Sequence, residues 1–150
     1  MKKFLLFFAL CIFSVQTFGQ ISVQKTQRDG EIILQSGNGY IYHNLTSDNY
    51  YLCVKSDNQY ESKQISIKLG NGKEEAIKSI IAIEDLWENC KNGDVIEIDA
   101  TKCTVYKGMM FYLQFDNPPH TAGSYFIGCE FNTKLGLLDK AIKKYNKGKF

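Results

Sequence analysis

The sequence has few of the residues on which nucleic-acid sites and many enzyme sites depend. Its 150 residues include two prolines, two histidines, one tryptophan and a single arginine, Arg28. Phosphate backbones and anionic lipids bind clustered Lys and Arg, whereas the lysines here are scattered along the chain. We therefore expect no nucleic-acid partner. One basic group lies at the chain end and is typical of a solvated helix face and tail: Lys140, Lys143, Lys144, Lys147 and Lys149.

Metal and nucleotide motifs are also missing from the sequence. There is no C-x-x-C pair, so the cysteines lack the spacing of a structural zinc site. Asp57, Asn58, Asp116 and Asn117 supply oxygen ligands without the spacing of a calcium-binding loop. The segment 70–72 precedes a predicted helix, but a turn with a helix N-cap explains it better than a phosphate-binding loop. We expect neither metal nor cofactor.

The chain begins with the three parts of a secretory signal. Lys2 and Lys3 precede an apolar run over residues 4–15, and the small residues Thr17 and Gly19 follow. The run is about a dozen residues long and a membrane-spanning helix needs about 20, so a permanent membrane anchor is disfavoured. A lipoprotein signal is also disfavoured, because Cys11 lies inside the apolar run. The leader resembles those of bacterial exported proteins, and we expect cleavage near Gly19 into the periplasm or the exterior.

What remains after cleavage, residues 20–150, is the length of one domain. Loss of the leader removes two of the 18 basic residues and leaves the rest balanced against 16 acidic ones. Because no Gly/Ser-rich or Pro-rich linker divides the chain, we expect a single secreted domain.

Four cysteines remain in that domain: Cys53, Cys90, Cys103 and Cys129. An even number of cysteines in an exported domain indicates disulfides. Sequence alone allows three pairings, and we predict Cys53–Cys90 and Cys103–Cys129 because each would join segments expected to pack together. The alternative is that two of the four are buried as free thiols.

The pattern of apolar residues predicts several strands and two helices. Alternation favours strands at 21–27, 31–35, 40–42, 50–55, 64–69, 94–98, 103–106, 109–115 and 124–131. A stripe at steps of three and four residues predicts a long helix at 73–91, and Asn132 or Thr133 is expected to cap a short last helix. Strands in runs, interrupted by only two helices, indicate an α+β fold. We expect a mainly antiparallel, curved sheet with the long central helix and the short C-terminal helix packed on it.

Candidate catalytic groups are few. His120 with Cys129 is the one local thiol and imidazole pairing, and it would need Asp116 or Asn117 to orient the histidine. Carboxylates gather along residues 84–99, and acid/base catalysis would require one of them to be desolvated. They are Glu84, Asp85, Glu88, Asp94, Glu97 and Asp99.

Tyrosines beside polar loops form the most distinctive feature of the sequence. Tyr40, Tyr42, Tyr50 and Tyr51 lie among Asn, Asp and Ser residues, a composition that suits recognition surfaces. Tyrosine also favours strands for purely structural reasons. The leading hypothesis is a non-catalytic binding or interaction module of the cell envelope or exterior, with a protein or an envelope component as partner. The alternatives are a small envelope hydrolase and an inhibitor or immunity-type protein.

Overall fold

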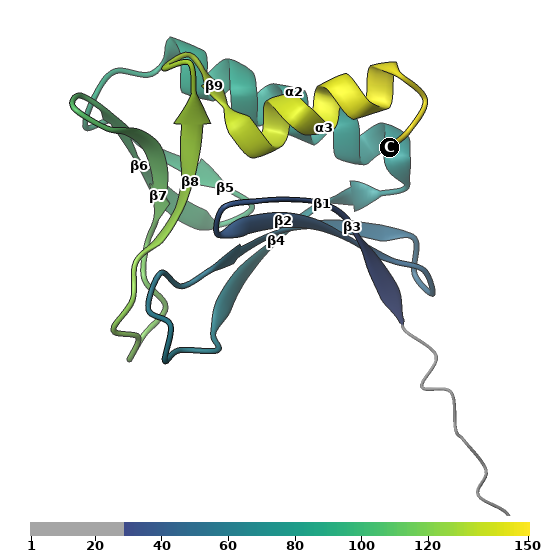
Figure 1. Cartoon of the computed structure of the whole chain (residues 1–150), viewed down its shortest axis with the longest axis horizontal. Helices are drawn as coiled ribbons and strands as arrows, with labels where there is room; N and C mark the ends of the chain where they lie inside the picture. The colour runs from purple at the N-terminus through teal and green to yellow at the C-terminus, as the bar shows by residue number, and fades with distance from the viewer. Residues whose placement is uncertain (1–28) are drawn as a thin grey trace, which may run out of the picture.

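The computed structural model describes residues 29–150, so the predicted signal peptide and the predicted strand at 21–27 lie outside the described residues. The described chain forms two antiparallel sheets and two helices, which confirms the α+β class (Figure 1). The elements are β1 (Gly30–Ser36), β2 (Gly39–Asn44), β3 (Asn49–Lys55), β4 (Gln64–Asn71), α2 (Lys73–Asn89), β5 (Val95–Ile98), β6 (Thr101–Lys107), β7 (Phe111–Phe115), β8 (Tyr125–Glu130), β9 (Lys134–Leu135) and α3 (Gly136–Asn146).

The first sheet is a meander in the order β1-β2-β3-β4. Its register places Ile41 opposite Leu52 and Tyr40 opposite Cys53. Because successive side chains of a strand point to opposite faces, Ile41, Leu52 and Ile67 share the face that is turned toward the helices. Neither of the two helices formed by residues 29–150 covers the other face of this sheet (Figure 1).

The second sheet has the order β5-β6-β7-β8-β9, so the curved sheet expected from the sequence is divided in two. The division falls at α2, which separates β4 from β5 along the chain. Two contacts close the corner between the sheets: a bridge between Ser56 and Tyr125, and a hydrogen bond from the Lys68 amide to Asp99 Oδ2 at 3.0 Å. The second contact satisfies an amide of the edge strand β4 that would otherwise be open to pairing.

Helix α2 begins where the sequence predicted, and it ends at Asn89. Gly72 precedes it with φ 80°, a conformation that glycine adopts without steric cost, and Glu74 and Glu75 occupy the first turn. Cys90 is already extended. At this end the ammonium of Lys107 donates to the carbonyls of Trp87, Glu88 and Cys90. A lysine from β6 therefore supplies the positive charge that the last turn of the helix lacks.

The last helix starts later than predicted, so Asn132 and Thr133 do not cap it. Phe131 and Asn132 have φ of 58° and 62°, which turns the chain back so that β9 pairs with Cys129 and Glu130 on β8. Leu135 occupies the N-cap position without a side-chain hydrogen bond. The next residue is Gly136, and a glycine suits this position because a Cβ there would lie only 2.7 Å from Glu130 Cγ.

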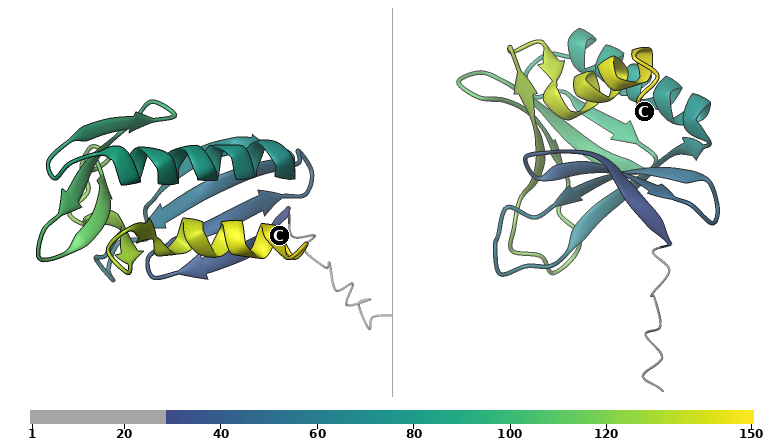
Figure 2. Two further views of the ribbon diagram at one scale, coloured as in Figure 1. Left: turned by 90° about the horizontal axis from the view of Figure 1, so that it is seen from above. Right: turned by 45° about the vertical axis from the view of Figure 1, so that its right-hand side comes forward.

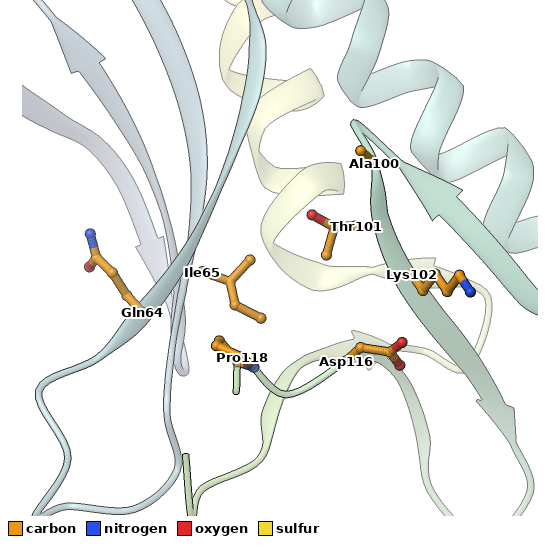
Figure 3. A pocket seen from close by; sticks show the side chains of 7 residues that line it. All are labelled: Gln64, Ile65, Ala100, Thr101, Lys102, Asp116 and Pro118. Atoms are coloured by element: carbon orange, nitrogen blue, oxygen red, sulfur yellow. The ribbon is translucent and has the colours of Figure 1, made fainter. Parts of the chain in front are cut away.

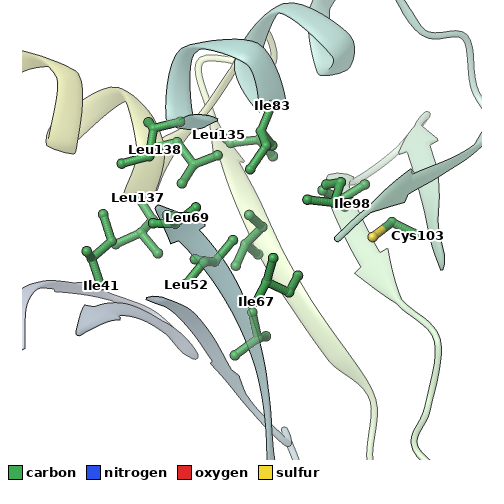
Figure 4. Packing of buried hydrophobic residues seen from close by; sticks show 14 of the residues in the cluster. Ile41, Leu52, Ile67, Leu69, Ile83, Ile98, Cys103, Leu135, Leu137 and Leu138 are labelled. Atoms are coloured by element: carbon green, nitrogen blue, oxygen red, sulfur yellow. The ribbon is translucent and has the colours of Figure 1, made fainter. Parts of the chain in front are cut away.

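One hydrophobic core lies between the helices and the two sheets (Figure 4). Seen from above, α2 and α3 run side by side over the first sheet, and they contact each other directly (Figure 2). Side chains from α2, α3 and both sheets meet in the core, among them Ile83, Leu138, Ile67 and Ile98. No helix formed by residues 29–150 combines the length and hydrophobicity required to span a bilayer.

The cysteine pairing predicted from the sequence is wrong for this arrangement, because all four described cysteines are free thiols. Cys53 lies on the uncovered face of the first sheet, whereas Cys90 follows α2 on the opposite side. Strand β7 lies between Cys103 on β6 and Cys129 on β8. Cys103 is opposite Phe115, and Phe115 is opposite Tyr125, so Tyr125 is the residue of β8 that is level with Cys103. Cys129 lies four residues further along β8. Four residues of strand span about 13 Å, beyond the reach of a disulfide of about 7 Å between Cα atoms.

Candidate functional site

Three of the four predicted tyrosines come together on the uncovered face of the first sheet. Tyr40 and Tyr42 alternate along β2, and Tyr51 lies directly opposite Tyr42 on β3. Each points away from the helices because its neighbours Ile41 and Leu52 point into the core. We call this surface the tyrosine face; it consists of Tyr40, Tyr42, Asn44, Tyr51, Cys53, Gln64 and Ser66.

Tyr50 is not part of the tyrosine face, which corrects the prediction. It is 5% exposed and belongs to the core on the helix side of β3. Its ring stacks on His43 with 4.1 Å between ring centroids and on Phe150 with 5.7 Å. Tyr50 thereby helps to attach the C-terminal residue to the sheet and has a structural role.

The tyrosine face is hollowed, with a cavity volume of about 290 Å³. The rings of Tyr42 and Tyr51 are half-buried and lie 6.5 Å apart at an interplanar angle of 39°. The Tyr42 ring reaches over β1 at Gly30, where a Cβ would lie 2.3 Å from the Tyr42 hydroxyl oxygen. A glycine at position 30 therefore allows the ring to lie low across the sheet with part of its surface open to solvent.

Tyr40 anchors the inner part of the tyrosine face. Its hydroxyl donates to Gln64 Oε1 at 2.5 Å, and the ammonium of Lys55 lies 5.3 Å from the centre of its ring. Burial raises the pKa of Tyr40, and the neighbouring Cys53 adds to this rise. The phenol of Tyr40 is therefore a neutral hydrogen-bond donor at the inner end of the hollow.

A larger hollow, of about 430 Å³, lies at the corner between the sheets, and its polar side chains do not converge (Figure 3). Ile65, Thr101 and Pro118 lie in its middle, whereas Gln64 points away from Lys102 and Asp116. Binding sites for small molecules usually combine an apolar wall with a few polar groups directed at one point. The tyrosine face has that arrangement and the corner hollow does not.

The predicted thiol and imidazole pair is not formed. His120 is exposed in the loop before β8, and Cys129 lies at the far end of β8, where its thiol donates to the carbonyl of Lys134 at 2.7 Å. Burial raises the pKa of the Cys129 thiol, and the carboxyl of Glu84 acts in the same direction. A thiol with a raised pKa is a poor nucleophile.

Among the predicted carboxylates, Glu84 is the one that the structure buries. It is 2% exposed, its Oε2 accepts a hydrogen bond from the Leu135 amide at 3.3 Å, and its Oε1 has no partner among the described residues. Desolvation raises the pKa of this carboxyl from 4.5 to about 7, although the Leu135 hydrogen bond and Lys134 oppose the rise. Glu84 is enclosed by α3 and β9 and lines none of the hollows described above, so a substrate does not reach it.

The remaining acids of this group are exposed, and several have structural roles. Asp94 Oδ2 accepts from the Lys91 amide at 2.6 Å, Asp99 binds the Lys68 amide, and Glu88 pairs with Lys134 at 2.6 Å. Within residues 29–150, no three His, Cys, Asp or Glu side chains are arranged to hold a metal ion.

A second aromatic surface was missed by the sequence analysis. Tyr106, Tyr112 and Phe126 form a row across β6, β7 and β8, with ring centroids 4.6 Å and 5.6 Å apart. Tyr112 and Phe126 line a hollow of about 200 Å³. The signal was present in the sequence, because all three alternate with the buried Val105, Leu113 and Ile127 along their strands.

Comparison with known protein families, curated proteins and solved structures finds no match to this chain. The function is therefore inferred from the tyrosine face itself. Three aromatic rings, two amides and a hydroxyl border one shallow hollow there, on the sheet face that neither α2 nor α3 covers.

Proposed function

We propose that this chain is a non-catalytic binding domain that acts in the cell envelope or outside the cell and recognises an envelope component or a protein through the tyrosine face. The observation that carries the proposal is the gathering of Tyr40, Tyr42 and Tyr51 on one uncovered sheet face, around a polar hollow. Tyrosine provides a large, rigid and amphipathic contact area at a small cost in side-chain entropy, which suits it to recognition.

The separation of the catalytic candidates supports a binding role over a hydrolytic one. A general base must come within hydrogen-bond reach of the proton that it removes. His120 and Cys129 lie at opposite ends of β8, and Glu84 is enclosed in the protein interior. A rigid sheet that presents aromatic rings needs no such machinery.

Capture from an envelope extract tests the proposal. Wild-type protein is expected to retain a specific partner, and Tyr42→Ala or Tyr51→Ala is expected to lose most of it, because each removes a ring that borders the hollow. Tyr60→Ala is the matched control: Tyr60 is 89% exposed and lies outside the tyrosine face, so its loss should leave capture unchanged. All three variants should keep the wild-type circular dichroism spectrum.

The outcomes separate the competing functions. Loss of the partner in the Tyr42 and Tyr51 variants alone supports the proposal. A partner that is retained equally by all variants contradicts the role of the tyrosine face, as does the absence of any specific partner. Capture of one soluble enzyme in a stoichiometric, inhibited complex favours the inhibitor or immunity-type alternative.

A further inference from the structure

We infer that the ligand of the tyrosine face is an acidic polysaccharide. The inference rests on the proposed function and specifies the chemistry of the ligand. It depends on three properties of the face: the open rings, the uncharged hydrogen-bonding groups in the hollow, and the sign of the charges beside it.

The rings provide flat apolar surfaces next to polar groups. Tyr42 and Tyr51 border a hollow that is open along the sheet and has a volume of about 290 Å³, at the lower limit of a small-molecule pocket. A sugar ring has an apolar face of C–H groups and an edge of hydroxyls, so it can stack on an aromatic ring while its edge forms hydrogen bonds. A shallow, open hollow also lets a polymer continue past both sides of the site.

The polar groups in the hollow match sugar hydroxyls, which both donate and accept hydrogen bonds. Asn44 Oδ1 accepts from the amides of Thr46 and Ser47 at 3.0 Å each. This fixes the side-chain amide, and its Nδ2 has no partner among residues 29–150. The Gln64 side chain is held on the opposite side of the hollow by Tyr40 and Ser66.

The charged side chains that strands β1 to β4 place on this face are of one sign. Lys68 lies directly opposite Tyr51 on β4, and the ammonium of Lys55 lies over the Tyr40 ring. No acidic side chain of strands β1 to β4 shares this face, since Glu31 lies near His43 on the helix side. Charge complementarity therefore favours a ligand that carries carboxylates or other anionic groups along a chain of sugar rings.

Binding to defined polysaccharides tests this inference. The probes are polygalacturonate in affinity gels, purified peptidoglycan sacculi in sedimentation, and neutral dextran as the uncharged control. We expect retention by one or both acidic probes and none by dextran. Retention by sacculi alone indicates an envelope glycan, and retention by polygalacturonate alone indicates an external acidic polysaccharide.

Variants assign the binding to the tyrosine face. Tyr42→Ala and Tyr51→Ala should each weaken binding about tenfold, or about 1.4 kcal/mol in binding free energy, because each removes an aromatic surface on which a sugar ring can stack. Tyr51→Phe keeps the ring and should retain most of the binding. Lys68→Gln should weaken binding and reduce its dependence on salt, whereas Lys78→Gln, exposed on α2, should not.

Three results would overturn the inference: no retention by either acidic probe, equal retention by dextran, or tighter binding to single-stranded oligo(dT) than to either acidic probe. If these probes fail while Tyr42→Ala still loses its partner in the envelope capture, the polysaccharide assignment falls and the binding function stands. If neither assay responds to the tyrosine variants, both proposals fail.

Discussion

Replacing Trp87 with alanine is expected to lower the free energy of unfolding by about 3–5 kcal/mol, a large part of the 5–15 kcal/mol that is typical of a domain. Trp87 is fully buried on α2 and belongs to the hydrophobic core. Its indole Nε1 donates to the Thr133 carbonyl at 3.1 Å, and the ammonium of Lys107 lies 4.8 Å from its ring centre. The alanine variant loses packing, a hydrogen bond and the ring beside Lys107 together.

Urea unfolding followed by circular dichroism measures this loss, because removal of the only tryptophan also removes its fluorescence. Trp87→Phe is the matched control, since it keeps an aromatic ring and loses the indole donor. It should cost roughly 1–2 kcal/mol, the range expected for a lost hydrogen bond in a buried position. Equal stability of the alanine and phenylalanine variants would contradict the role assigned to packing around Trp87.

The stability of the protein is expected to fall by about 3 kcal/mol as the pH rises from 4.5 to above 7, through Glu84 alone. Burial raises the pKa of this carboxyl in the folded protein to about 7, against an ordinary value of 4.5. Below pH 4.5 the carboxyl is protonated in both states. Between these two pH values the unfolded chain releases the proton and the folded chain keeps it, so unfolding becomes easier as the pH rises. Above pH 7 the loss is complete.

Glu84→Gln isolates this contribution, because the amide keeps the shape of the side chain and does not titrate. Unfolding free energies measured from pH 4 to pH 8 should fall less with pH in this variant than in the wild type. Glu88→Gln, one helical turn away and bonded to Lys134, is the control and should keep the fall. Parallel curves for the wild type and Glu84→Gln would show that the Glu84 carboxyl is solvated in the folded protein.

The elements of the fold are readable from the sequence where one local pattern decides them. Helix α2 is predicted to within two residues, because its apolar stripe, its acidic first turn and Gly72 all agree. Strand β4 is predicted equally well, because Ile65, Ile67 and Leu69 alternate with polar residues. Local agreement of this kind is typical of natural sequences.

The predictions that failed depend on how separate segments of the chain are placed relative to one another. Whether the strands form one sheet or two depends on how α2 carries the chain from β4 to β5, and no local pattern encodes that path. The start of α3 was misplaced because the positive φ values at Phe131 and Asn132 have no glycine to mark them. The predicted disulfides failed because strand order, unknown from the sequence, separates Cys103 from Cys129.

The candidate site was predicted in part. Tyr50 and Tyr51 are adjacent on β3, and successive side chains of a strand point to opposite faces of the sheet. Leu52 and Val54 lie two and four residues after Tyr50, so they are on the same face of the strand and indicate that the Tyr50 side chain points into the core. The apolar Cys53 between them hides this alternation. Glu84 was recognised as a candidate, yet its burial was not, although it lies four residues after Ile80 and three before Trp87 on the apolar stripe.

Nitration of tyrosines by tetranitromethane, read by mass spectrometry in the free protein and with its captured partner bound, tests the central claim most directly. A tyrosine face that binds the partner predicts that Tyr42 and Tyr51 become protected in the complex while the exposed Tyr60 reacts as before. Unchanged nitration of Tyr42 and Tyr51, with protection appearing instead at Tyr106 and Tyr112, would place the binding surface on the second sheet and contradict the account.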